Sequence, residues 1–454
     1  MMSNNLFDTF NAVSSKQWKQ KIQFDLKGAD YNDTLIWKNN EDIDVKPFYH
    51  ADDFKTLPNI PKTKATQWKV CQSIFVADVN KSNLKAIDII ERGAESIDFI
   101  IPTEDISIKN LIKNIDSETV LLHFNLLFLS EAFTNNLNTL LPHAKINIDC
   151  ISQLAKTGNW FKSLNDDFKT FKNITKKTSS ISVNCSLYQN AGATMVQQLA
   201  YALAHANEYL NFLESSEIKS PSLKVIFHIS VGTNYFFEIA KLRALRTLWK
   251  SLASEYEINT VCEIMTTPTT RNKTLYDYNT NMLRTTTECM SAILGGANTI
   301  CNLPYDSIYH KSNEFGERIS RNQLLILKHE SYFNKVNNPS DGSYYIESLT
   351  SQLSEKALEL FKNIESNGGF LKQLKQGTIQ RKIKESATKE QNQFNKGETV
   401  LIGTNKHPNT NDKIKDDQDL YPFVKTNKRK TLIEPIIEQR LSEHLEQNRL
   451  KNED

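Results

Sequence analysis

The sequence predicts an α/β fold, a (β/α)8 TIM barrel with an N-terminal extended and helical arm and a C-terminal helical extension. Two observations predict it. From about residue 66, short apolar runs alternate with stretches of helical period, a pattern typical of a parallel sheet covered by helices. Eight such runs occur, and eight strands favour a closed barrel over an open doubly wound sheet, which is the alternative.

The eight predicted strands are apolar runs of strand length, most of them rich in β-branched residues. They lie at 68–76, 96–101, 119–124, 145–149, 180–184, 224–230, 260–265 and 298–304. Helices are expected between most of them, for example at 83–93 and 235–256. The second of these helices keeps an apolar stripe at helical spacing, so it is predicted to pack against the sheet.

The chain divides into four predicted segments. They are an N-terminal arm that embraces a partner (1–65), the barrel (66–345), a helical extension packed on the barrel (346–405), and a C-terminal wrap that ends in a short amphipathic helix at about 433–450 (406–454). The arm has too many aromatic residues for a disordered tail, so they are expected to bury against the body or a partner. These aromatic residues are Phe7, Phe10, Trp18, Phe24, Tyr31, Trp37 and Phe48.

Composition excludes several classes of protein. Lys and Arg number 55 against 53 Asp and Glu, so neither nucleic acid nor an anionic membrane is expected as a partner held by bulk charge. No apolar run approaches the roughly 20 residues of a membrane span. The N-terminus lacks the pattern of a signal peptide, and a cytoplasmic location is expected. The six cysteines include no Cys-x-x-Cys pair, which indicates buried reduced thiols rather than a metal site.

Few residues indicate chemistry by themselves. The chain has no glycine-rich phosphate loop, and Gly295-Gly296 is interpreted as a helix C-cap. His123 and His228 lie inside predicted strands and are interpreted as core or wall residues. His407, in a polar loop, is interpreted as a surface or packing residue.

In a TIM barrel the loops at the carboxyl ends of the strands are the first places to expect an active site, and two of these loops are informative here. After the strand at 180–184 come Cys185, Ser186 and Leu187, which include no acid, base or histidine. The loop 266–274 carries hydroxyl groups and two cations that could bind an anion. We interpret it as a polar, well-hydrogen-bonded loop.

Five stretches taken together resemble one known family. They are "AGATMVQQLAYALAHANEYL", "FFEIAKLRALRTLW", "YNTNMLRTTTECMSAILGGANTI", "RISRNQLLILKHES" and "GSYYIESLT". In order and in residue type they resemble the barrel of methylmalonyl-CoA mutase, an adenosylcobalamin-dependent isomerase. Within that family "TQWKVCQSIFV", "RGAESIDFIIP" and "LAKTGNWF" look more like the small, non-catalytic subunit of the bacterial heterodimeric enzyme than like the large subunit.

The resemblance fails at the positions that carry chemistry in catalytic members. Those members have a Tyr-His pair before the Ala-Gly-Ala-Thr segment, His-Cys-Gln after the seventh strand and Arg-Gln-Tyr in the first strand. In place of the Tyr-His pair this chain has Ser186 and Leu187. The His and Gln of the second motif are replaced by Met265 and Thr267, and the Arg and Tyr of the third by Cys71 and Ser73. Leucine neither donates a hydrogen bond nor transfers a proton, so the resemblance implies that this chain has no catalytic residue.

The cofactor motif of the family is also missing. No histidine here has an aspartate two residues before it and a glycine three after it. Fewer than fifty residues follow "GTNKHPN", whereas a cobalamin-binding flavodoxin-like domain needs on the order of 100. The resemblance therefore implies that this chain binds no cofactor and no metal, and that adenosylcobalamin is held by a large catalytic subunit, the partner in a heterodimer.

Two alternatives remain open. The first is a catalytic acyl-CoA mutase barrel that uses a separate cobalamin-binding subunit, with Thr267, Arg271 or Tyr276 as the reactive groups. The second is a standalone acyl-CoA-binding module.

Overall fold

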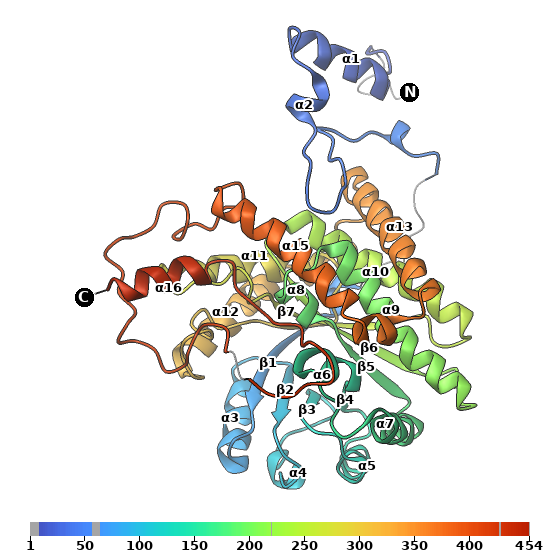
Figure 1. The fold of residues 1–454 in the computed structure, drawn as a ribbon, viewed down its shortest axis with the longest axis vertical. Coiled ribbons are helices and arrows are strands. Elements are labelled where there is room, and N and C mark those ends of the chain that lie inside the picture. The colour runs from blue at the N-terminus through green and yellow to red at the C-terminus, as the bar shows by residue number, and fades with distance from the viewer. Residues whose placement is uncertain (1–8, 57–63, 219, 426–427, 454) are drawn as a thin grey trace, which may run out of the picture.

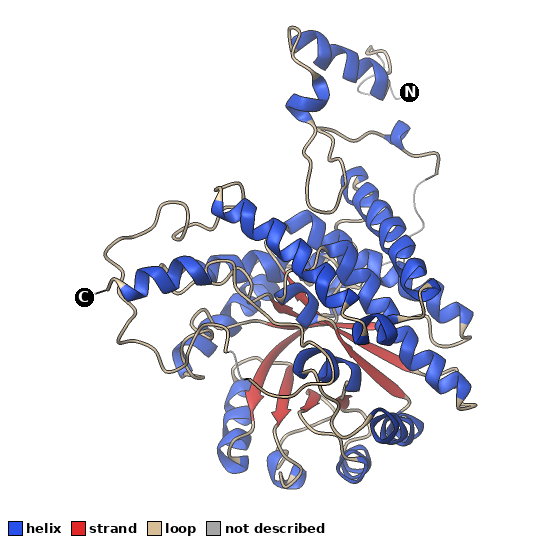
Figure 2. Ribbon diagram, viewed as in Figure 1, coloured by secondary structure: helices blue, strands red, loops and turns tan. Residues whose placement is uncertain are grey.

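Eight parallel strands form the centre of the molecule (Figures 1 and 2). The computed structural model describes residues 9–56, 64–218, 220–425 and 428–453. All eight predicted strands are confirmed. They are β1 (Lys69–Phe75), β2 (Ser96–Ile101), β3 (Leu121–Leu126), β4 (Lys145–Asn147), β5 (Ser180–Asn184), β6 (Lys224–Val231), β7 (Glu263–Pro268) and β8 (Thr299–Cys301).

The sheet closes on itself almost completely. Its strand order is β4-β3-β2-β1-β8-β7-β6-β5, so the first strand of the barrel, β1, pairs with the last, β8. Among the described residues, β4 and β5 share no backbone ladder. The predicted barrel is therefore confirmed, with one seam between β4 and β5.

Helices follow most of the strands and surround the barrel. They are α3 (Val79–Glu91), α4 (Ile108–Leu111), α5 (Glu131–Leu140), α6 (Cys150–Thr157), α7 (Leu164–Thr178), α8 (Ser186–Asn190), α9 (Met195–Ser215), α10 (Tyr235–Glu255), α11 (Thr280–Leu294) and α12 (Glu314–His329). As predicted, Gly295 caps the carboxyl end of α11. No helix in the described ranges is both long and apolar enough to cross a membrane.

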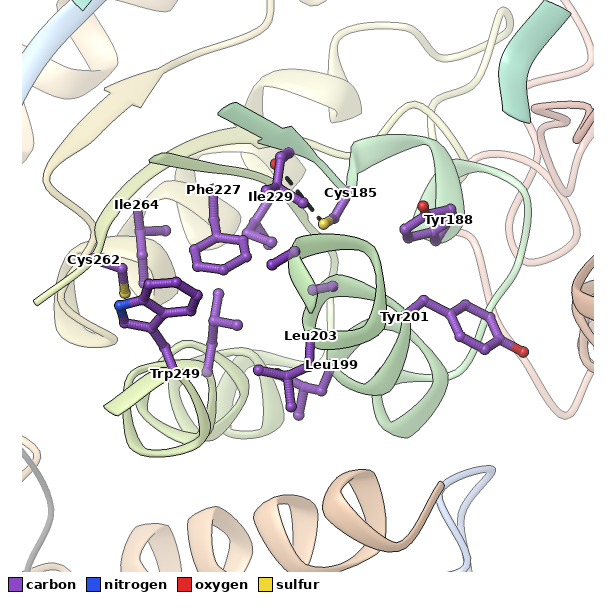
Figure 3. Close-up of a cluster of buried hydrophobic side chains, with 14 of the residues drawn as sticks. Cys185, Tyr188, Leu199, Tyr201, Leu203, Phe227, Ile229, Trp249, Cys262 and Ile264 are labelled. Carbon is purple, nitrogen blue, oxygen red and sulfur yellow. Dashed lines mark hydrogen bonds between the residues drawn. The ribbon is translucent and has the colours of Figure 1, made fainter. Parts of the chain in front are cut away.

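Two large clusters of apolar side chains fill the space between the sheet and its helices. The smaller one lies under β1–β4, and the larger one joins β5–β8 to α9, α10 and the C-terminal helices. In the larger cluster Trp249 of α10 lies edge-on against Phe227 of β6, with ring centroids 5.5 Å apart (Figure 3). The described cysteines are all buried and free, as the sequence predicted.

The C-terminal extension is helical only in parts. Its helices are α13 (Tyr344–Ser366), α14 (Phe370–Lys375), α15 (Thr378–Asn395) and α16 (Glu443–Lys451). The predicted terminal helix at 433–450 is wrong in its first half, because residues 431–442 form no helix and lie along the body as irregular chain with a bend and a turn. There the backbone N–H of Ile436 donates to Ala155 of α6, and that of Leu441 donates to Arg271. Pro435 has no N–H to give to a helix.

The arm consists of two parts with different surroundings. Its helices are α1 (Ser15–Asp25) and α2 (Tyr31–Leu35), and two 3-10 turns follow, η1 (Ala51–Asp53) and η2 (Ala65–Gln67). Residues 37–54 pack on the body through ring pairs, among them Trp37 with Phe237 at 5.8 Å and Tyr49 with Tyr345 at 5.1 Å. Helix α1 contains no buried residue and lies away from the barrel (Figure 1). Phe7, another aromatic residue of the arm, lies outside the described residues.

Candidate functional site

A polar cavity of about 420 Å³ lies at the carboxyl ends of β5, β6 and β7. Its walls come from the α8–α9 turn, the loops after β6 and β7, helix α15, and arm residues 37–41. TIM barrels bind and convert their substrates at this end, so the cavity is the first place to look for a site.

The arm closes one side of the cavity through Glu41. The two carboxylate oxygens of Glu41 accept hydrogen bonds from the backbone N–H groups of Met195 and Val196, each at 2.9 Å. These N–H groups are the free donors at the start of α9, where the helix dipole favours an anion. Burial nevertheless raises the pKa of Glu41, because the carboxylate is removed from water. Next to it, Asn40 exchanges hydrogen bonds with Gln393 of α15.

A buried cation lies behind three side chains of the cavity wall, those of Gln189, Gln198 and Glu238. The Lys241 Nζ of α10 lies 2.6 Å from Glu238 and donates to the side chains of Gln189 and Gln198 and to the carbonyl of Ser230. Each of these contacts is within 2.9 Å. Such a network satisfies a buried charge and fixes α8, α9 and β6 relative to one another.

The loop after β7 bonds to helix α15 and to the C-terminal segment. Arg271 donates from Nε to Glu390 of α15 at 2.6 Å and from Nη1 to the Gln439 carbonyl at 2.8 Å. Lys273 lies 2.8 Å from Glu288, and burial lowers the pKa of Lys273. Both cations of the loop are therefore paired inside the chain, which agrees with the interpretation of a well-hydrogen-bonded polar loop.

The six substituted positions do not all meet in one place. Leu187 is only 4% exposed and belongs to the large apolar cluster, whereas its neighbour Ser186 is half-buried at the mouth. Cys71 and Met265 form a small buried cluster with Cys301. Ser73 donates to Asp98 at 2.9 Å and contacts the Cys301 thiol at 3.1 Å. Thr267 is half-buried at the top of β7, paired in register with Ser230.

Three strands around the barrel interior carry polar side chains that the sequence analysis did not single out as a group. Both ring nitrogens of His123 and both side-chain polar atoms of Asn147 have no hydrogen-bond partner, and neither has Nε2 of His228. Burial lowers the pKa of His123 to about 3 and that of His228 to about 4, so both rings are neutral at pH 7. On neighbouring β2, burial raises the pKa of Asp98 to about 6.

Asp149 organises the seam and was not predicted. Its Oδ1 lies 2.9 Å from His205 Nε2 and accepts from the Tyr209 hydroxyl at 2.7 Å. The Nδ1 of His205 lies 3.0 Å from the Tyr188 hydroxyl. Burial raises the pKa of Asp149, but the charge and hydrogen bond of His205 and two backbone N–H donors outweigh it, so the pKa lies below its usual value. The whole chain of groups is buried, which indicates a structural role.

Sequence comparison identifies the family. The chain matches the family model of methylmalonyl-CoA mutase over residues 143–451. It is 34% identical over 440 residues to the methylmalonyl-CoA mutase small subunit of Porphyromonas gingivalis, which covers 89% of this chain and 71% of that one. This chain belongs to the methylmalonyl-CoA mutase family. The resemblance in the barrel segments is thereby confirmed.

Some relatives in the methylmalonyl-CoA mutase family match a shorter stretch. The chain is 38% identical over 238 residues to the methylmalonyl-CoA mutase of Rhizobium meliloti, a match that spans 51% of this chain and 33% of that one. Among solved structures, a Yersinia pestis DHPS covers 59% of this chain and 95% of that one, at 12% identity and a TM-score of 0.34. That likeness is too low to carry an argument.

The lining of this cavity offers no histidine to the cobalt of adenosylcobalamin, the cofactor that the resemblance implies for the family. Cobalt in the family's cofactor motif is bound by a histidine, and no histidine lines the described cavity. Elsewhere, the His205 ring lies between Asp149 and Tyr188, and the His310 ring lies between Asp306 and Asp417.

Proposed function

We propose that this chain is the non-catalytic small subunit of an adenosylcobalamin-dependent methylmalonyl-CoA mutase of the cytoplasm. In the proposed heterodimer, a large subunit binds the cofactor and interconverts (R)-methylmalonyl-CoA and succinyl-CoA. The observation that carries the proposal is Leu187. It stands where catalytic members of the family have a histidine, and its side chain packs in the apolar core.

The remaining chemistry at the mouth supports a silent barrel. A mutase must stabilise charge on a thioester carbonyl and shield radicals from water. Two buried cations at or behind the cavity wall, Arg271 and Lys241, are already paired with Glu390 and Glu238. Neither is free to bind the carbonyl or the carboxylate of a substrate without breaking a buried ion pair.

The alternative of a catalytic barrel with a borrowed cobalamin-binding subunit has less support. It needs Arg271 or Tyr276 as a reactive group. The Arg271 guanidinium bonds the C-terminal segment, and the Tyr276 hydroxyl bonds Glu453 beyond α16. The side chains of both residues therefore hold the tail, and Thr267 alone is no general acid or base at pH 7.

Helix α1 is the segment we propose as a contact to the large subunit. Phe24 is 79% exposed and Trp18 is 51% exposed on a helix without a buried residue. Large exposed aromatic side chains mark surfaces that associate with another protein. This pattern argues against a standalone acyl-CoA-binding module, because such a module would leave them in water.

The test is co-expression with a cobalamin-binding mutase chain from the same source, followed by size exclusion with light scattering and a mutase assay. We expect an active one-to-one complex and no turnover by this chain alone, with or without adenosylcobalamin. Turnover by the purified chain would favour the catalytic alternative. A stable monomer that forms no complex with the large chain and binds acyl-CoA would favour the binding module.

A matched pair of variants tests the role of α1. Deletion of residues 1–29 removes α1, and with it the ring contact of Trp18 with Phe48, but leaves the ring pairs of Trp37 and Tyr49 with the body in place. We expect an unchanged melting temperature of the lone chain and loss of the complex. The control, Phe236→Ala, alters an exposed aromatic residue of α10 and should leave the complex intact. Equal retention of the complex by both variants would contradict the proposal.

A further inference from the structure

Three sulfur-containing side chains meet inside the barrel. Cys71 of β1, Met265 of β7 and Cys301 of β8 form one buried cluster, each no more than 4% exposed. Cys71 and Cys301 are directly paired in the register of two hydrogen-bonded strands. Met265 lies on the next strand, opposite Thr299.

The direction of the neighbouring side chains shows that these three point inward. Gln72, between Cys71 and Ser73, reaches outward and donates to Glu317 of the surrounding helix α12 at 3.0 Å. Ile264 and Ile300, which precede Met265 and Cys301, belong to the outer apolar cluster. Successive side chains on a strand point to opposite faces, so Cys71, Met265 and Cys301 face the interior.

The thiols are linked to a proton acceptor. The Cys71 and Cys301 side chains lie on directly paired residues of adjacent strands and belong to the same buried cluster. The Ser73 hydroxyl donates its single hydrogen to Asp98 at 2.9 Å. Its 3.1 Å contact with Cys301 is therefore one in which the thiol donates and the hydroxyl oxygen accepts. A proton can pass from Cys301 through Ser73 to the Asp98 carboxylate.

From this arrangement we propose that Cys71, Cys301 and Met265 form a three-sulfur binding site for monovalent copper. Two thiolates and a thioether are soft ligands, and sites of this composition select Cu(I) over hard cations. A structural zinc site needs four ligands, and this cluster offers three. Among the described residues, no group of three or more His, Cys, Asp or Glu side chains could hold a metal, so no such site competes for it.

The binding step balances in charge and in electrons. Two S–H bonds break, two copper–thiolate bonds form, and the thioether sulfur of Met265 donates an electron pair. One proton passes through Ser73 to Asp98, and the other leaves to solvent. Copper stays monovalent and no group is oxidised. One positive charge enters and one leaves, so the net charge of the barrel interior is unchanged.

The experiment is an anaerobic titration of the reduced full-length chain with Cu(I) supplied as its acetonitrile complex, in competition with bathocuproine disulfonate. We expect one equivalent to be withheld from the chelator, with a sulfur-to-copper absorption band. X-ray absorption should show three sulfur neighbours. No withheld copper in the unaltered chain would overturn the proposal.

Variants separate this site from the other buried thiols. Cys71→Ser and Cys301→Ser should each abolish the withheld equivalent, whereas Cys262→Ser, a buried cysteine of the outer cluster, should retain it. Should a serine variant misfold, Met265→Leu preserves volume and apolar character, and it should reduce the sulfur neighbours from three to two. The proposal is refuted if Met265→Leu, or a folded Cys71→Ser/Cys301→Ser double variant, still withholds one full equivalent of copper with three sulfur neighbours.

Discussion

The Asp149 carboxylate accepts a hydrogen bond from the backbone N–H of Asn184 at 2.7 Å, from the end of β4 to the end of β5. These two strands are the neighbours in the described barrel that share no ladder. The same carboxylate accepts the Ser152 N–H at 2.8 Å and so begins helix α6. One side chain thus does at the seam what a backbone ladder does between other strands.

Asp149→Ala is expected to destabilise the chain strongly. The substitution leaves His205, the Tyr209 hydroxyl and two backbone N–H groups without their buried acceptor, and the free energy of unfolding should fall by about 3–5 kcal/mol. Urea unfolding measures this free energy. Asp78→Ala is the matched control, because Asp78 also caps a helix by accepting a backbone N–H but at an exposed place, and about 1 kcal/mol is expected there. Equal losses would contradict the role of the seam.

His123 is expected to destabilise the fold in acid. Burial lowers the pKa of His123 to about 3, with His228 and Lys145 acting in the same direction. Between about pH 6.5 and 3 the unfolded chain binds a proton that the native chain does not, so stability falls as the pH falls through this range. At pH 5 the loss is on the order of 2 kcal/mol.

Replacement of the ring tests this pH dependence. In His123→Gln, the unfolding free energy should fall less between pH 7 and pH 5 than in the unaltered chain. His143→Gln removes an exposed histidine and should leave the slope unchanged. If the unfolding free energies of His123→Gln and the unaltered chain depend on pH in the same way, the ring takes up its proton in the folded chain as it does in the unfolded chain, which contradicts the prediction.

Glu41→Ala is expected to loosen the arm over the cavity. The Met195 and Val196 N–H groups lose their acceptor, and residues 37–45 lose their polar contact with α9. Hydrogen exchange should become faster at 37–45 and at the start of α9, and remain the same in α13. Glu398→Ala is the control, since Glu398 lines the same cavity but is exposed. Unaltered exchange at 37–45 would mean that the ring contacts of Trp37 are sufficient to hold the segment.

Leu187→His is not expected to restore a catalytic group. A neutral histidine at this buried place loses apolar contacts and brings ring nitrogens into the core, at a cost of about 1–3 kcal/mol. We expect a lower melting temperature and no turnover by the chain with adenosylcobalamin. Ser186→Tyr, at the half-buried neighbour, is the comparison and should change stability less. Turnover by either variant would argue that the barrel is close to active.

The fold was predictable because its strands are marked by local apolar runs. Even so, β7 begins three residues later than predicted, at Glu263, since Val261 is apolar but exposed. The Asp149 site was not predictable, because its partners lie 35 and 56 residues away at Asn184 and His205. The irregular segment before α16 was missed for a similar reason. Its apolar spacing suits a helix, but Pro435 lacks an N–H group and the backbone N–H groups of Ile436 and Leu441 donate to carbonyl groups far away in the sequence.

The pairing of β1 with β8 has a consequence for how this protein is made. A ribosome releases β1–β4 first, and the outer edge of β1 stays unpaired until β8 is synthesised more than two hundred residues later. Exposed strand edges invite association between nascent chains. We expect the first half of the barrel to need a chaperone or a slow rate of synthesis, and a truncated chain that ends before β8 to aggregate.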